Sequence, residues 1–184
     1  MKRPNIKGLI TTGVMATSLL APTSASAAND MFLKIDGVQG ESLDATHKGE
    51  IQVLSWSWGE SAGTAKTRRG SLPAACIQDL AFTKFVDSAT PALIVNTMTG
   101  EVAQTAVLVV RRAAGGQEFL KFTMKNVTIS SYQTGASQVE NALTENVVLH
   151  FESLEGHYVK QKPDGSLDTP IPFQISGGNS AGCQ

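Results

Sequence analysis

The chain has 184 residues, with 15 Lys and Arg, 16 Asp and Glu, and a formal net charge of −1. This balance offers no broad basic surface, so nucleic acid is not a predicted partner. The length suits one domain with a sizeable core and leaves little room for a second.

Residues 1–27 have the layout of a signal peptide. Lys2, Arg3 and Lys7 form a basic start, residues 8–20 are mostly apolar, and Ala25-Ser-Ala27 is an Ala-x-Ala cleavage signature. The apolar run is too short and too rich in Thr and Gly to span a bilayer, so we predict no stable membrane insertion. Cleavage after Ala27 leaves 157 of the 184 residues, and 12 basic against 16 acidic side chains give them a net charge of −4.

Strand signals dominate after residue 27. Short runs rich in Val, Ile, Thr and aromatic residues, each bounded by turn residues, predict strands. These runs are Phe32 to Ile35, Ile51 to Trp58, Thr105 to Arg112, Glu118 to Met124, Val127 to Tyr132 and Asn146 to Glu152. Ala114-Gly115-Gly116 separates two of them closely enough for an antiparallel hairpin.

Alternation along these strands predicts two faces. In the run that carries both tryptophans, Leu54, Trp56 and Trp58 share one side and are predicted core residues, while Ser55 and Ser57 project the opposite way. The same rule applied to Glu118 to Met124 predicts one buried and one outward set. The buried set is Leu120, Phe122 and Met124, and the outward set is Lys121, Thr123 and Lys125.

One segment breaks the two-residue rhythm and predicts a short helix. Thr90 stands at an N-cap position, Pro91 at the first helical position and Gly100 just past the end. Its β-branched content requires support from packing, which we assign to Leu93, Ile94 and Met98 against a sheet. Many strands and one helix indicate a mainly β fold, a closed or nearly closed β-barrel.

Two segments lack periodicity. Residues 59–75 form a long loop that carries Lys66, Arg68 and Arg69, and loops of this length are usually functional or disordered, so we predict a contact role. The C-terminal segment from Gln161 supplies one edge strand at most, and we expect disorder beyond Ser176.

No constellation for catalysis is evident. His47, His150 and His157 do not have metal-ligand spacing, and His150 fits an outward position on a strand. Glu140 and Glu145 fit a solvated rim, and nucleotide-binding glycine motifs are missing. We therefore predict no enzymatic activity, no metal and no cofactor.

The two cysteines, Cys76 and Cys183, leave two readings open. They could pair in an oxidising compartment. We favour the alternative, in which Cys76 is a small buried hydrophobe and Cys183 an exposed thiol.

Three segments together resemble the haemolysin-coregulated protein family, Hcp. They are residues 47–59, Asp79 to Leu93 and Leu120 to Tyr132, and the resemblance runs from about Met31 to Tyr158. It implies a β-barrel of two antiparallel sheets with one short helix. It also implies a secreted structural subunit of the type VI secretion system that forms hexameric rings stacked into a tube.

The resemblance further implies partners and contact residues. Ser55 and Ser57 would face the channel and its small effector proteins, and Lys66, Arg68 and Arg69 would contact the adjacent ring of the stack. Copies of the same chain, the spike protein VgrG, the sheath and the baseplate are the other implied partners.

The leader departs from the family pattern, because the family typically needs no cleaved signal. Either it directs export through the periplasm, or translation starts near Met31 and the protein has a cytoplasmic assembly pool. An alternative function is an exported β-barrel with the same fold that forms no tube and acts as an adhesin or soluble carrier.

Overall fold

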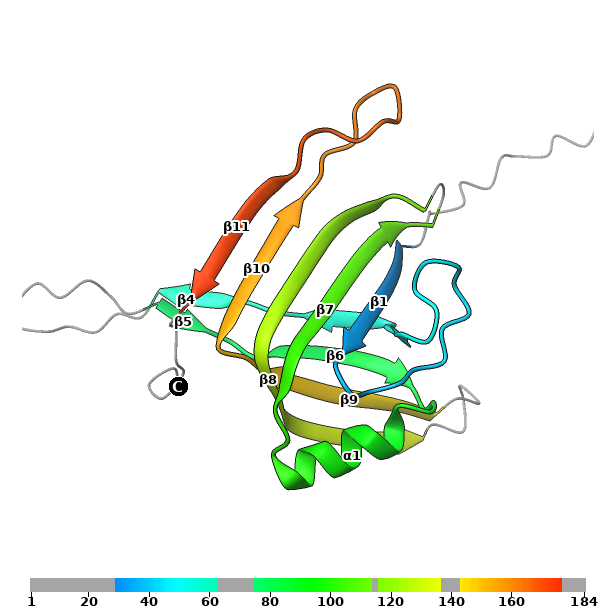
Figure 1. Ribbon diagram of the computed structural model, residues 1–184, viewed down its shortest axis with the longest axis vertical. Helices are drawn as coiled ribbons and strands as arrows, with labels where there is room; N and C mark the ends of the chain where they lie inside the picture. The colour runs from blue at the N-terminus through cyan, green and yellow to red at the C-terminus, as the bar shows by residue number, and fades with distance from the viewer. Residues whose placement is uncertain (1–28, 63–74, 114–115, 137–142, 177–184) are drawn as a thin grey trace, which may run out of the picture.

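The computed structural model describes residues 29–62, 75–113, 116–136 and 143–176. Within these ranges the chain forms eleven strands and one helix (Figure 1). The strands are β1 (Asn29–Ile35), β2 (Ile51–Gln52), β3 (Ser55–Ser57), β4 (Glu60–Ala62), β5 (Ala75–Ile77), β6 (Leu80–Phe85), β7 (Ala103–Arg112), β8 (Glu118–Ala136), β9 (Leu143–His150), β10 (Ser153–Tyr158) and β11 (Ile171–Ser176). The helix is α1 (Thr90–Thr99). This architecture confirms the predicted fold class.

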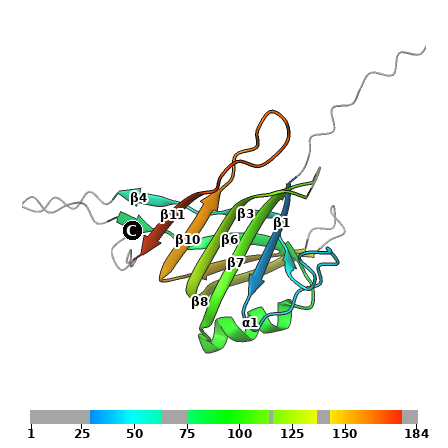
Figure 2. The same ribbon diagram turned by 45° about the horizontal axis from the view of Figure 1, so that its top comes forward.

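Two antiparallel sheets share strand β8. In sheet A the order is β2-β1-β7-β8-β10-β11, and in sheet B it is β8-β9-β6-β3, while β4 pairs with β5. Strands β9 and β10 follow each other directly, and both run antiparallel to β8. The chain thus forms one long hairpin that bends from one sheet into the other (Figures 1 and 2).

Strand β8 accomplishes this bend through two irregularities. It was predicted as two strands, but it is one strand of 19 residues. Asn126 has a φ of 51°, in the left-handed region, and a bulge in the pairing with β9 leaves Ser130 without an opposite residue. Because β-bulges bend a strand and increase its twist, the second half of β8 points away from sheet A and begins sheet B.

The opposite corner lies between β2 and β3. The amide of Val53 donates to the carbonyl of Met31 in sheet A at 2.9 Å, and the amide of Leu54 donates to the carbonyl of Thr83 in sheet B at 2.8 Å. The change of sheet interrupts the alternation, so Val53 is buried and Leu54 is 38% exposed. The prediction of Leu54 as a core residue was therefore wrong, because it assumed one unbroken strand.

The core fills the space between the sheets and is rich in aromatic contacts. Phe122 lies at its centre and makes edge-to-face contacts with Trp56, Trp58 and Phe173, at ring-centroid distances of 5.3, 5.8 and 5.7 Å. Such pairs each contribute about 0.5–1.5 kcal/mol beyond the burial of their area. Phe122 of sheet A thus contacts both tryptophans.

Helix α1 packs beside β8 and ends, as predicted, at Gly100, which has a φ of 68°. Its N-cap is Ala89 rather than Thr90, and the Thr90 hydroxyl instead bonds to side chains of sheet B. Leu93 is buried, but Ile94 is 41% and Met98 83% exposed, so the prediction that these two pack on a sheet was wrong. In the parts of the chain that the structure describes, no helix is long and apolar enough to cross a membrane.

Strand β11 is the edge strand that the C-terminal segment was expected to supply, and it pairs with β10. Phe173 lies over Gly156, where a Cβ atom would overlap its ring. Glycine at position 156 therefore allows β11 to bring an aromatic side chain down to the core.

Candidate functional site

The outer face of sheet B begins with the two serines that the sequence singled out. Ser55 and Ser57 of β3 are exposed, and on the opposite side of the strand Trp56 and Trp58 are half-buried against the core. Strand pairing extends this outer face across the sheet.

Small, uncharged side chains make up the central rows of this face. Thr83 lies opposite Ser55, and its hydroxyl donates to Oδ1 of Asn146 on β9 at 2.7 Å. Asn146 in turn lies opposite Gln133 of β8. The next row joins Ser57, Ala81, Val148 and Ser131. Both rows are neutral, and the apolar Ala81 and Val148 lie between the serines of the second row.

One row further, the same face carries an ionisable pair. Asp79 precedes β6, and its Oδ1 lies 2.9 Å from Nδ1 of His150 at the end of β9. The Ser130 hydroxyl, which the bulge in β8 places here, donates to the other Asp79 oxygen at 2.8 Å. The Asp79 and His150 side chains are 30% and 36% exposed. The outward position predicted for His150 agrees with its partial exposure.

A buried charged network lies on the inner side of the same strands. Nζ of Lys84 lies 2.7 Å from Oε2 of Glu145, and both side chains are 0% exposed. Thr90 and Tyr132 donate to Oε1 of Glu145 at 2.7 and 2.8 Å, and Asp87 lies 2.7 Å from the Lys84 ammonium. The network joins the start of α1 to β6, β8 and β9. Glu145 had been predicted on a solvated rim, which is wrong.

Burial and hydrogen bonding act in opposite directions on the Glu145 carboxyl. Burial favours the neutral acid, but hydrogen bonds from Lys84, Thr90 and Tyr132 favour the carboxylate, and together they hold the pKa of Glu145 below its ordinary value. Burial, followed by the bond to Glu145, raises the pKa of Tyr132. The Glu145 carboxyl therefore stays ionised while the tyrosine remains a donor.

A second polar cluster fixes the 36–50 segment onto β1 and β7. The Arg111 guanidinium contacts the carboxylates of Asp30 and Asp44 and lies 4.8 Å from the ring centroid of Phe32. His47 belongs to the same cluster. Its ring stacks on the Phe32 ring with the centroids 4.5 Å apart, and its Nδ1 lies 2.9 Å from Oε2 of Glu50. Arg111 is 67 and 81 residues from Asp44 and Asp30 in sequence, so no local motif could reveal these contacts.

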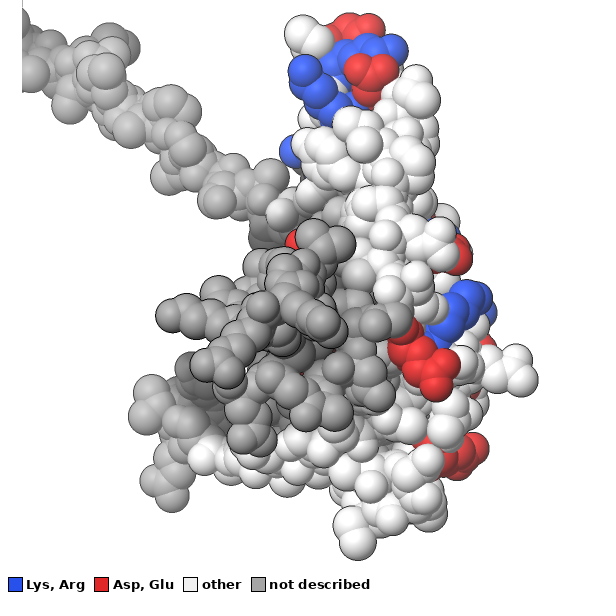
Figure 3. Space-filling view, turned by 90° about the vertical axis from the view of Figure 1, so that its left-hand side faces the viewer, with Lys and Arg blue, Asp and Glu red and all other residues white. Residues whose placement is uncertain are grey.

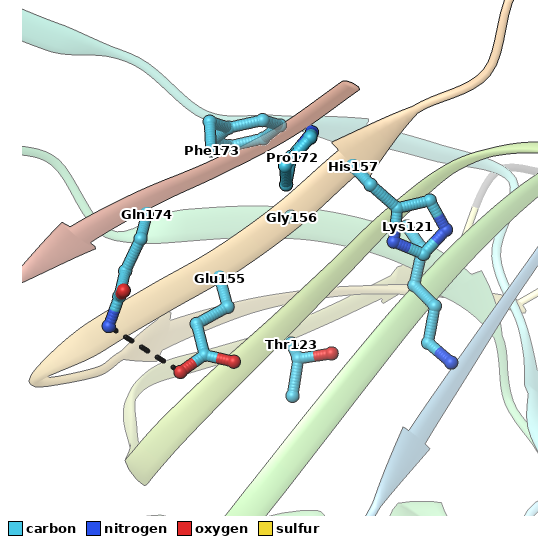
Figure 4. Close-up of a pocket in the computed structure, with 8 residues that line it drawn as sticks. All are labelled: Lys121, Thr123, Glu155, Gly156, His157, Pro172, Phe173 and Gln174. Atoms are coloured by element: carbon cyan, nitrogen blue, oxygen red, sulfur yellow. Dashed lines mark hydrogen bonds between the residues drawn. The ribbon is translucent and has the colours of Figure 1, made fainter. Parts of the chain in front are cut away.

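An open groove of about 590 Å³ lies on the outer face of sheet A (Figure 4). Lys121 of β8, Glu155 and His157 of β10 and Gln174 of β11 project into it, and Gln174 donates to Glu155 at 3.5 Å. Both signs of charge are present. This face differs in chemistry from the neutral rows of sheet B.

The described surface at the edge that carries β11 holds side chains of both signs. In Figure 3 charged side chains gather at one end, where the loop between β10 and β11 holds Lys160, Lys162, Asp164 and Asp168, and again lower on the same face. Most of the described surface between these two regions is uncharged.

The remaining sequence-predicted residues fall into four groups. Phe122 and Met124 are buried, and Leu120 is half-buried against the core. Thr123 lines the groove of sheet A beside Lys121, whereas Lys125 is exposed. Cys76 lies in β5. Outside the described residues lie Lys66, Arg68 and Arg69, the cleavage residues Ala25 and Ala27, and Cys183, together with Glu140.

Comparison with known proteins places this architecture in a family. A sequence model described as "Type VI secretion system effector, Hcp" matches residues 32–158. Protein hcp1 of Pseudomonas aeruginosa is 44% identical over 145 residues, which cover 77% of this chain and 90% of that protein. The crystal structure of Hcp1 from Salmonella typhimurium is similar with a TM-score of 0.69 and 33% identity, covering 81% of this chain and 95% of the other. The crystal structure of a type VI secretion system effector from Yersinia pestis is similar with a TM-score of 0.68 and 31% identity, covering 80% of this chain and 100% of the other. The chain therefore belongs to the Hcp family of type VI secretion proteins.

Proposed function

We propose that the protein is a tube subunit of a type VI secretion system, which assembles into hexameric rings that stack and carry small effector proteins in their channel. The family match over residues 32–158 is the observation that carries this proposal. Hcp proteins are secreted structural proteins, and we propose no catalytic step for this member. Its spike, sheath and baseplate contacts belong to the same proposal.

The channel wall that we propose is the outer face of sheet B. Ser55 and Ser57 are exposed on this face, and the paired rows that run through Thr83 and Asn146 continue it with small neutral groups. A wall of hydroxyl and amide groups can hold different cargo surfaces through many weak, hydrated contacts. It therefore suits a channel that must also let its cargo leave.

Native mass spectrometry of the protein from its producing cells tests the proposal. An assembly of six subunits supports the proposed role as a tube subunit. A subunit mass that matches a chain beginning at Ala28 establishes that the leader is cleaved. A monomer that starts at Ala28 would instead indicate an exported relative with no tube.

Stacking is assigned to the basic residues of the 59–75 segment. The double substitution Arg68→Glu and Arg69→Glu should leave single rings intact and prevent tubes, because charge reversal opposes an acidic partner surface. Tubes of normal length in electron micrographs of the double variant would contradict this assignment.

A further inference from the structure

We propose that the start of β1 protects the predicted cleavage site, so that the leader is removed while β1 is undocked and a chain that folds first keeps it. The inference goes beyond the proposed function, because it concerns the leader and does not depend on tube assembly. It makes the cleaved, exported chain and the uncleaved, cytoplasmic chain two alternative products, and the docking of β1 decides between them.

The domain begins immediately after the predicted cleavage site. Cleavage breaks the bond between Ala27 and Ala28, and β1 begins at Asn29, which lies opposite Arg112 of β7. Two residues of fully extended chain span at most about 7 Å. A peptidase must hold extended chain on both sides of the bond that it cuts, so it acts on the opened rather than the folded form of such a segment.

Strand β1 is held on both of its sides. Along its whole length, Asn29–Ile35, it pairs with β7, and Phe32 and Leu33 also pair with β2. Leu33 is 0% exposed, and Phe32 and Ile35 are each 3% exposed. Undocking β1 therefore breaks backbone pairing with two strands and brings these three large apolar side chains into water.

A cluster of side chains fixes the first residues of β1. Nε and Nη2 of Arg111 both donate to Oδ2 of Asp30 at 3.2 Å, and Nη1 donates to Oδ1 of Asp44 in the 36–50 segment at 3.0 Å. The Arg111 side chain is 14% exposed. Its guanidinium also lies 4.8 Å from the ring centroid of Phe32, two residues after Asp30. Fraying of the strand at the cleavage site requires that these contacts break.

Protection by folding makes the order of two events decisive. If cleavage comes first, the chain begins at Ala28 and β1 docks without the leader. If docking comes first, cleavage waits for β1 to open, and its rate falls with the fraction of chains that are open. Opening a strand that is paired on both sides requires a large part of the free energy of unfolding. We therefore expect the folded chain to be cut at least about a hundredfold more slowly than an accessible site.

A linker variant tests this protection. About twelve Gly and Ser residues are inserted between Ala28 and Asn29, so the sequence at the cleavage site is unchanged but the domain begins farther away. Both full-length chains are purified, shown to be folded by tryptophan fluorescence, and incubated with purified bacterial signal peptidase in detergent. Mass spectrometry measures the fraction cut after Ala27. The linker variant should be cut at least about a hundredfold faster than the unmodified chain.

Substitutions test the cluster at the start of the strand. Asp30→Ala removes the β1 partner of Arg111 and should speed cleavage of the folded chain about two- to fivefold, the effect of one partly exposed ion pair. The matched control is Asp36→Ala, at an exposed position just after the strand, which should leave the rate unchanged. Asp30→Ala in the linker variant should also leave the rate unchanged, because that site is already accessible. Faster cleavage there would instead show a direct effect on the peptidase and refute the role of the cluster.

Two results would overturn the inference. Equal cleavage rates for the unmodified chain and the linker variant would show that β1 does not protect the site. A linker variant that is not cut at all would show that residues 1–27 are no substrate of the peptidase, and the leader prediction would be refuted with the inference. Neither result concerns ring or tube assembly, so the proposed function is tested separately.

Discussion

Removing the Lys84 ammonium should destabilise the fold far more than its single side chain suggests. In Lys84→Met the apolar stem is retained, but the Glu145 carboxyl, which has no exposed surface, keeps only the hydroxyls of Thr90 and Tyr132 as partners. Asp87, which also contacts the ammonium at 2.7 Å, loses its partner as well. Breaking one side of a buried pair typically costs about 3–5 kcal/mol.

Urea denaturation followed by tryptophan fluorescence measures this cost, because both tryptophans, Trp56 and Trp58, lie against the core. With an m-value of about 2 kcal/mol/M, a loss of about 4 kcal/mol lowers the urea midpoint by about 2 M. A loss below about 1 kcal/mol would show that the pair is hydrated or rearranges easily, and would refute the reasoning.

The double variant Lys84→Met with Glu145→Met separates the pair from its packing. Both charges then disappear together, so we expect a large part of the lost stability to return. Additive losses in the double variant would contradict a direct interaction between the two side chains. Glu152→Gln is the matched control, since this exposed carboxylate has Asn126 as its partner and its loss should change stability by less than about 0.5 kcal/mol.

Three further predictions concern other parts of the fold. A hydrogen bond from Arg111 holds the pKa of Asp44 below its ordinary value, so the stability that Asp44 contributes is present above its unfolded pKa of about 3.9 and is lost as the pH falls through the folded value. Asp44→Asn should therefore flatten the decline of the melting temperature between pH 5 and 2, and an unchanged decline would contradict the assignment. Gly156→Ala should cost about 1–3 kcal/mol in urea denaturation, because the added methyl group overlaps the Phe173 ring. Gly100→Ala should cost about 1 kcal/mol by the same assay, because its φ is 68°, whereas Gly135→Ala, with no atoms within 4 Å of the added methyl, should cost less than either.

Local signals were sufficient where the strand pattern was undisturbed. Strands β1, β7 and β9 lie where alternation and turn residues predicted them, and α1 ends at the predicted glycine. Strand β6 was not predicted as a strand, because its inward side reads Leu80, Phe82 and Lys84 and a lysine in third place breaks the apolar pattern. Strand β10 has too few apolar residues to be recognised alone.

The site depended more strongly on long-range pairing. Alternation placed Ser55 and Ser57 on one face, but the partners of that face come from β6, β8 and β9, which no local pattern relates to β3. Glu145 is 61 residues from Lys84 in sequence, so nothing near it indicates that a cation neutralises it in the core. The Leu54 prediction failed for a related reason, since the change of sheet after Val53 depends on hydrogen bonds to two different sheets.

The place of β1 has a consequence for the order of folding. It is the first described strand of the chain, yet it lies between β2 and β7, and its β7 partners are 71 to 83 residues later. During synthesis β1 cannot pair with β7 until β7 has left the ribosome. Strand β8, in contrast, follows β7 closely in sequence and precedes its partners β9 and β10, so these strands can pair as they emerge. We therefore expect these hairpins to nucleate the domain, with β1 joining late at the free edge of β7. Until it arrives, that edge is open to strands of other nascent chains.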